Sequence, residues 1–313
     1  MGKIKANQAI KAAMTQLLKT GRKDNVLILY PPEAKKLATS FYENGQKHIE
    51  KMCTIQVDFA WGQNPFEQPV LSAIQSADST IILGSDFTPT HLSSAIPQKV
   101  LCISASNLEE LNRFSTQKVN RVLDKTLKFA EILSIGKTLH ISGAHNTDLQ
   151  FSIQNITGQA DAGGVPGSET CFSLPVGEVR FQPEPKTLNG RIAIHALAGR
   201  PPKYPPASAI IKNNHIVQIK GQGEIAQKLR RQLRLLGSSA KEIIEMGIGL
   251  NEHLPFSNTV SEDKKALGAI TFSIGANETR NTLFRDLVTG ILFKPDVTVD
   301  GKSILKNGEL ILL

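Results

Sequence analysis

Acidic side chains beside glycines mark the stretch from Glu245 to Leu310 as the part of the chain best suited to chemistry. It opens with Glu245-Met-Gly-Ile-Gly-Leu-Asn and passes through Glu262-Asp-Lys-Lys-Ala-Leu-Gly. Phe284-Arg-Asp and Lys294-Pro-Asp-Val-Thr-Val-Asp follow. Carboxylates at strand ends can serve as acids, bases or cation ligands, and neighbouring glycines let other backbone approach closely. The pattern therefore predicts a buried polar site built on a β-sheet.

Length and composition are those of a two-domain soluble globular protein. The chain has 313 residues, of which 40% are hydrophobic and 20% charged, and this length favours two domains. The net charge of +8 would suit nucleic acid or an acidic partner. No nucleic-acid motif and no aromatic interleaving accompany the charge. We therefore interpret it as an ordinary basic surface and rank nucleic-acid binding last.

Neither a membrane segment nor a disulfide framework is indicated. No run approaches the ~18 apolar residues of a membrane span, and lysines interrupt the N-terminal helical pattern, so no signal peptide is predicted. We expect a cytoplasmic protein without a membrane partner. The three cysteines form no CxxC or Cys/His cluster, which argues against disulfides and structural zinc. Cys53 and Cys102 lie in apolar runs and are expected to be buried, inert thiols.

The first half alternates apolar runs with helical segments. Four strands are expected, at residues 25–30, 53–59, 79–84 and 99–104. Such alternation predicts an α/β domain with a doubly wound, mainly parallel sheet, similar to Rossmann and flavodoxin folds, over residues 1–136. The region contains no GxGxxG or GxxxxGK[ST] sequence, so no nucleotide cofactor is predicted.

The second half, residues 137–313, changes character. Its strand-like runs alternate apolar and polar residues, as half-exposed antiparallel strands do, and Asn213-Asn214 has the composition of a hairpin turn. The span from Gly158 to Glu178 holds five glycines and two prolines, which indicates a loop. A helix is expected over 224–236. This half is predicted to be an α+β domain with a mainly antiparallel sheet that carries the site.

Motifs of the second half resemble the aminopeptidase T group of metallopeptidases and, equally, the related ring-cleaving dihydroxypyridine dioxygenases. The matching segments follow the family's order over most of residues 137–313. They are Asn146-Thr-Asp-Leu, Leu174-Pro-Val-Gly-Glu178-Val, Glu245-Met-Gly-Ile-Gly-Leu-Asn, Asp263-Lys-Lys-Ala-Leu-Gly268, Phe272-Ser-Ile-Gly, Phe284-Arg-Asp286 and Pro295-Asp-Val-Thr-Val-Asp-Gly. Because the family hosts two unrelated chemistries, the resemblance implies the fold more specifically than the activity.

The resemblance implies a metal centre of carboxylates and histidines, of which this chain keeps only the acids. Glu178, Glu245 and Asp286 stand at the family's acidic positions and are the expected catalytic residues or metal ligands. Where the family has histidines, this chain has Thr271 and Phe284. Phenylalanine cannot ligate a metal, and a neutral threonine hydroxyl is a poor ligand for zinc or iron.

Two interpretations of the retained acids stay open. They could form an oxygen-only site for a harder ion such as Mg²⁺, Mn²⁺ or Ca²⁺. Alternatively, they are paired with Arg285, Lys264 or Lys265 in a polar cluster, which we favour. The cofactor is thus either none or a divalent metal. His253 and His145 are weaker candidate ligands, ahead of His195.

Three functions are compatible with these residues. The first is a divergent family member with a degenerate metal centre that acts on or binds a peptide or a small cyclic substrate, and would be a metallo-aminopeptidase-like hydrolase if active. The second is a non-catalytic partner or binding protein, in a setting such as a peptide-modifying pathway. The third is an active aminopeptidase or ring-cleaving dioxygenase with substituted ligands. A homodimer is implied by the resemblance.

Overall fold

The computed structural model describes most of the chain. The described residues are 7, 10, 11, 13–58, 66–84, 99–104, 111, 116–161, 171–197, 200–236, 241–275 and 288–311. No helix among them is long and apolar enough to cross a membrane.

The chain divides into two compact units. Unit 1 comprises residues 1–121 and 162–176, and unit 2 comprises residues 122–161 and 177–313. The long helix α5 (Thr116–Ile135) passes from the first unit into the second. The predicted boundary after residue 136 stays a prediction. The contacts place α5 mostly in unit 2 and return a later segment to unit 1.

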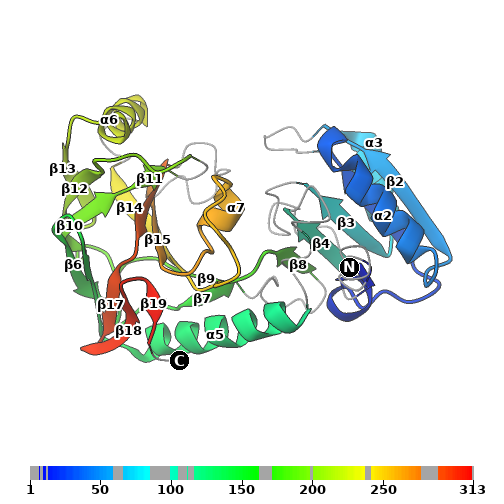
Figure 1. Ribbon diagram of the computed structural model, residues 1–313, viewed down its shortest axis with the longest axis horizontal. Helices are drawn as coiled ribbons and strands as arrows, with labels where there is room; N and C mark the ends of the chain where they lie inside the picture. Colours follow the sequence, from blue (N-terminus) through cyan, green and yellow to red (C-terminus); the bar gives the residue numbers. More distant parts are fainter. Residues whose placement is uncertain are drawn as a thin grey trace. The chain divides into compact units, whose positions relative to one another are not determined.

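Unit 1 is built on a five-stranded parallel sheet in the order β2-β1-β3-β4-β8. Its strands are β1 (Asn25–Tyr30), β2 (Lys51–Gln56), β3 (Ser79–Leu83), β4 (Lys99–Ile103) and β8 (Cys171–Leu174). Its short helices are η1 (Ala13–Leu17), η2 (Pro32–Ala34), α2 (Lys35–Gly45) and α3 (Gln68–Ser76). Helix α2 runs alongside β1 and β2 (Figure 1). The predicted mainly parallel α/β fold of the first half is confirmed.

Two details of unit 1 differ from the sequence-based expectations. Strand β2 begins at Lys51, and Cys53 within it is exposed, whereas Cys102 on β4 is buried as expected. Cys53 differs because β2 is the edge strand of the sheet, with a neighbour on one side only. The segment expected to be a loop, residues 158–178, contains two strands: β8, which pairs with β4, and β7 in unit 2.

Unit 2 is dominated by a 14-stranded, mainly antiparallel sheet that wraps around its core (Figure 1). Its strands are β5 (Thr138–Gly143), β6 (Thr147–Ser152), β7 (Gln159–Asp161), β9 (Glu178–Phe181), β10 (Asn189–Ile194), β11 (Ala196–Leu197), β12 (Ala207–Lys212), β13 (His215–Lys220), β14 (Glu242–Gly249), β15 (Ala269–Gly275), β16 (Val288–Phe293), β17 (Asp296–Val299), β18 (Lys302–Lys306) and β19 (Glu309–Leu310). Helices α6 (Glu224–Leu236) and α7 (Val260–Asp263), with the greater part of α5, complete it. The predicted antiparallel second half is confirmed.

The hairpin between β12 and β13 forms where the sequence predicts it. Asn213 and Asn214 have φ values of 50° and 66°, the left-handed conformation that a tight two-residue hairpin turn requires and that asparagine tolerates. The side-chain oxygen of Asn214 also accepts a hydrogen bond from the N–H of Leu188 at 2.9 Å. This contact ties the turn to the segment before β10.

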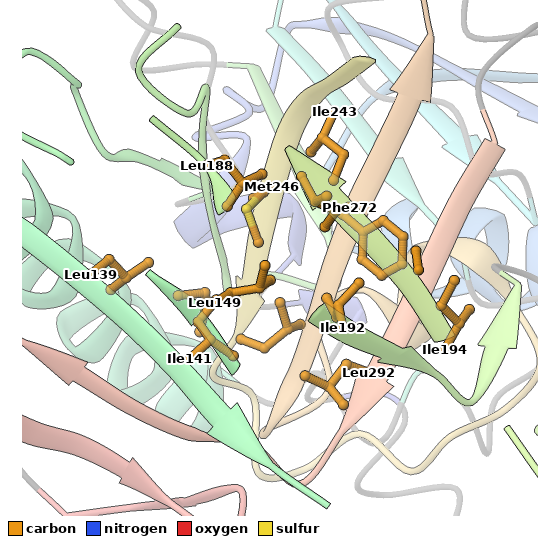
Figure 2. Close-up of a cluster of buried hydrophobic side chains, with 14 of the residues drawn as sticks. Leu139, Ile141, Leu149, Leu188, Ile192, Ile194, Ile243, Met246, Phe272 and Leu292 are labelled. Carbon is orange, nitrogen blue, oxygen red and sulfur yellow. The ribbon is translucent and has the colours of Figure 1, made fainter. Parts of the chain in front are cut away.

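The core of unit 2 lies inside the curved sheet. Apolar residues of β5, β6, β10, β14 and β16 share this core with Phe272 of β15 (Figure 2). Phe272 and its neighbours Ile270 and Ile274 are fully buried. Since successive side chains of a strand point to opposite faces, Thr271 and Ser273 must lie on the other face. Burial of the apolar set thereby orients the polar residues of β15 away from the core.

Candidate functional site

Three neighbouring strands place the polar residues of the expected site on one face of the sheet. β14 pairs with β9 on one side and with β15 on the other. Glu178 lies opposite Gly249, while Gly247 lies opposite both Arg180 and Thr271. Directly paired residues share a face, so these side chains lie together on the face that the core does not use. Glu245, on the same strand as Gly247 and two residues before it, joins them there.

Gly247 leaves the space in which Glu178 meets Thr271. The Thr271 hydroxyl donates a hydrogen bond to Oε1 of Glu178 at 3.2 Å, and both residues are buried. A Cβ atom at position 247 would lie 2.1 Å from Oε1 of Glu178 and 2.5 Å from Oγ1 of Thr271. The glycine of the Glu-Met-Gly sequence is therefore required because two side chains cross the strand there.

Positive side chains lie among these acids. Burial raises the pKa of Glu178, and the nearby carboxylates of Glu245 and Asp161 raise it further, against the opposing effects of Lys264 and Arg180. Burial lowers the pKa of Arg180, but Glu178, Glu245 and Asp161 more than compensate, and the net direction is upward. Arg180 thus stays a guanidinium within reach of three carboxylates.

A buried ion pair closes one side of the cluster. Asp161 on β7 lies opposite Glu178 in the sheet, and its Oδ2 is 2.7 Å from Nζ of Lys265. The two side chains are only 13% and 7% exposed. Because water hardly screens such a pair, its attraction is stronger than that of a surface ion pair. Asp161 is thereby engaged by a lysine that follows α7.

The described part of the site does not fit the carboxylate-and-histidine metal centre implied by the resemblance. Glu178 already accepts a hydrogen bond from the hydroxyl of Thr271. Position 271 is one at which the resemblance implies an imidazole. The acids Asp161, Glu178 and Glu245 are matched by Arg180, Lys264 and Lys265. These positive side chains would oppose the entry of a cation at close range. No group of three or more His, Cys, Asp or Glu side chains in the described ranges is arranged to hold a metal ion.

The remaining expected residues have separate surroundings. Asp286, with Phe284 and Arg285, lies outside the described residues. His253 follows β14, where its backbone N–H donates to Oδ1 of Asn251 at 2.9 Å and its Nε2 lies 3.8 Å from Oε1 of Glu252. His145 lies beside His195 in a different cavity, with 5.5 Å between ring centroids.

Arg180 and Asp161 are the site residues that sequence reasoning missed. Asp161 lies in a glycine-rich span that was interpreted as a loop. Arg180 could have been identified from the sequence. Glu178-Val-Arg180 alternates polar and apolar residues, so a strand there must present both charged side chains on one face. Because β9 has only four residues, this alternation is too short to distinguish a strand from a loop in the sequence.

Glu178→Gln is expected to stabilise the protein increasingly as pH rises. Since the pKa of Glu178 is raised in the folded state, its favourable contribution is present below its ordinary value of 4.5 and is lost as pH increases. We expect a Tm gain on the order of 3 °C at pH 8, shrinking towards pH 4, measured by calorimetry. Glu309→Gln, at an exposed strand end, serves as control and should show no such trend. Equal Tm changes at both pH values would contradict this prediction.

The fold and the buried acidic site define a two-unit protein in which a parallel α/β unit accompanies a large antiparallel sheet that carries the polar site. The family described as "NicX: 2,5-dihydroxypyridine 5,6-dioxygenase" matches residues 33–312, and the chain belongs to this family. A comparison with curated protein sequences gives no match.

Two solved structures share the fold. The first is 2,5-dihydroxypyridine dioxygenase from Pseudomonas putida KT2440, with a TM-score of 0.75 and 16% identity over 99% of this chain and 98% of that one. The second is wild-type AmpT from Thermus thermophilus, with a TM-score of 0.67 and 14% identity over the whole of both chains. The family match confirms the predicted relation to the dihydroxypyridine dioxygenases, and the likeness to AmpT shows a shared fold.

Proposed function

We propose that this chain is a divergent member of the dihydroxypyridine dioxygenase family that binds a small cyclic substrate at the cluster of Glu178, Arg180 and Glu245 without the family's carboxylate-and-histidine metal centre. The observation that carries the proposal concerns the side chain of Arg180. Its Nε is buried and has no hydrogen-bond partner among the described residues. A buried guanidinium N–H normally has an acceptor, and a bound substrate oxygen would supply one.

The charges of the cluster suit a ring that carries an acidic hydroxyl or a carboxylate. Arg180 can bind such an oxygen through a charge-assisted hydrogen bond. Glu178 has a raised pKa, which favours its protonated form at a pH where a free glutamic acid is ionised. A carboxylic acid beside a guanidinium can donate a proton or a hydrogen bond to the substrate. Glu178 and Glu245 are therefore the proposed acid–base residues, and Asp286 belongs to the same proposal from the resemblance.

The family relation supports a cyclic substrate over a peptide. The family description and the structure from Pseudomonas putida both name dihydroxypyridine, and the shared fold covers nearly the full length of this chain. A peptide substrate would follow the AmpT relation instead. The homodimer expected from the resemblance is part of the same proposal, and sedimentation velocity tests it.

Calorimetric titration with 2,5-dihydroxypyridine tests the proposal. We expect saturable binding by the purified protein, with at least about a tenfold loss in Arg180→Met, because a charge-assisted hydrogen bond is lost. Arg180→Lys should retain part of the affinity, and Arg231→Met on the exposed face of α6 should retain all of it. Circular dichroism checks that the variants fold.

Two results would overturn the proposal. One is the absence of saturable binding by the folded protein. The other is oxygen uptake with 2,5-dihydroxypyridine that requires added Fe²⁺, because ring cleavage through iron would show a working metal centre. Leucine p-nitroanilide is the parallel peptidase probe, and its hydrolysis would favour the peptide alternative.

A further inference from the structure

A cavity in unit 2, of about 820 Å³, lies where the turn after β5, the segment after β10 and the end of β16 meet. Its lining includes His145, His195, Tyr204, Phe256, Phe293 and Lys294. None of the Glu178 cluster lines it. Its volume is within the ~300–1,000 Å³ range of small-molecule sites. The residues that line it indicate which ligands it could bind.

Flat rings form the walls of this cavity. The His195 ring lies 5.7 Å from Phe293, nearly parallel to it, and 5.9 Å from Tyr204. Phe256 contacts Phe293 at 4.0 Å between centroids. Tyr204 and Phe256 are 70% and 41% exposed, which is unusual for rings of this size. A planar ring could stack against this group and cover the exposed aromatic surface.

His195 contributes a neutral hydrogen-bond donor to the wall. Its Nδ1 accepts a hydrogen bond from the backbone N–H of Phe293 at 3.3 Å. The proton of the neutral ring therefore lies on Nε2. Burial, with the neighbouring His145, lowers the pKa of His195 to about 4, and the ring is therefore neutral at physiological pH. The Nε2–H group can donate to a ligand oxygen.

Lys294 supplies a positive charge to the lining of the cavity. Lys306, the other lysine of the lining, is paired with Asp296 at 2.6 Å. In the described ranges no carboxylate forms an ion pair with the exposed Lys294. The backbone of Lys294 is held in place by its N–H, which donates to the carbonyl of Gly268 at 3.1 Å. The cavity therefore combines aromatic walls with one uncompensated positive charge.

We propose that this cavity binds a planar aromatic carboxylate, with the ring stacked among Tyr204, Phe256 and Phe293 and the carboxylate held by Lys294 and the Nε2–H of His195. The site is separate from the Glu178 cluster and does not depend on the function proposed there. A neutral aromatic compound would lack the ion pair, and an aliphatic acid would lack the stacking.

Calorimetric titration with 2-naphthoate tests this proposal on the full chain. We expect saturable binding that is at least about tenfold tighter than that of neutral 2-naphthalenemethanol or of non-planar cyclohexanecarboxylate. Lys294→Met and Phe256→Leu should each weaken 2-naphthoate binding about tenfold. Lys302→Met, an exposed lysine outside the lining, should not change it. Glu178→Gln should also leave it unchanged, which separates this site from the acidic cluster.

Three outcomes would overturn the proposal. The first is no saturable binding of 2-naphthoate, and the second is equal affinity for its neutral analogue or in Lys294→Met. The third concerns the alternative that the exposed rings form a subunit contact. In that case sedimentation velocity would show an oligomer that Phe256→Ser dissociates. 2-Naphthoate would then neither bind nor displace the subunit contact.

Discussion

Lys265→Met is expected to lower the free energy of unfolding by about 3–5 kcal/mol, the largest stability effect anticipated for this chain. The methionine keeps much of the side-chain volume but leaves the Asp161 carboxylate, 13% exposed, without its ammonium partner at 2.7 Å. A buried charge that loses its ion-pair partner costs more than the pair contributes, because the desolvation of the carboxylate is then less well compensated. The neighbouring Glu178 would add to the repulsion.

Urea unfolding of matched variants checks this expectation. The double variant Asp161→Asn/Lys265→Met removes both charges and should recover much of the loss, because the carboxylate is removed together with its ammonium partner. Arg22→Met removes one partner of an exposed pair whose side chains are 80% and 50% exposed, and it should cost less than about 1 kcal/mol. A loss in Lys265→Met as small as that in Arg22→Met would refute a strong buried interaction.

Thr271→His with Phe284→His is expected to raise the affinity for Zn²⁺ or Fe²⁺ by on the order of 100-fold or more. The change returns imidazoles to the two positions at which the resemblance places them. Residues that merely support a metal ligand already change affinity by about 10- to 100-fold, so two direct ligands should have at least that effect. Thr271 is 3% exposed, and its hydroxyl lies 3.2 Å from Glu178, so an imidazole there would be close to a carboxylate ligand.

Metal content after gel filtration and titration with Zn²⁺ measure this change. Thr298→His, on β17 away from Glu178 in the sheet order, controls for a histidine placed elsewhere. Thr271→His alone should show an intermediate affinity. Stoichiometric metal in the unaltered protein would contradict the proposed metal-free site. Unchanged affinity in the double variant would show that positions 271 and 284 do not correspond to the family's ligands.

Local patterns were enough to predict several elements of this chain. The four apolar runs of the first half became the parallel strands β1 to β4, and Asn213-Asn214 formed the expected hairpin turn. The helix expected at 224–236 is α6. These features depend on neighbours in sequence, such as residue alternation, turn chemistry and helical spacing, and such signals are present in any short window.

The composition of the polar site was decided by pairing between distant segments. β7 and β8 arise from a glycine-rich span because they add to existing strands, β9 and β4, whose unpaired backbone groups they satisfy. That pairing puts Asp161 opposite Glu178, and β14 brings Arg180 and Thr271 to the two sides of Gly247. The register between strands as distant in sequence as β9 and β14 leaves no trace in local spacing.

From the sequence alone the fold class could be predicted. The same reasoning predicted Glu178 and Glu245 as site residues and the replacement of two expected imidazoles by Thr271 and Phe284. Only the tertiary structure showed that Arg180 and the Asp161–Lys265 pair lie beside those acids and that His145 and His195 belong to a separate aromatic cavity. The physical reason is that residue type is encoded locally, whereas charge balance and cavity shape depend on which distant side chains share a buried space.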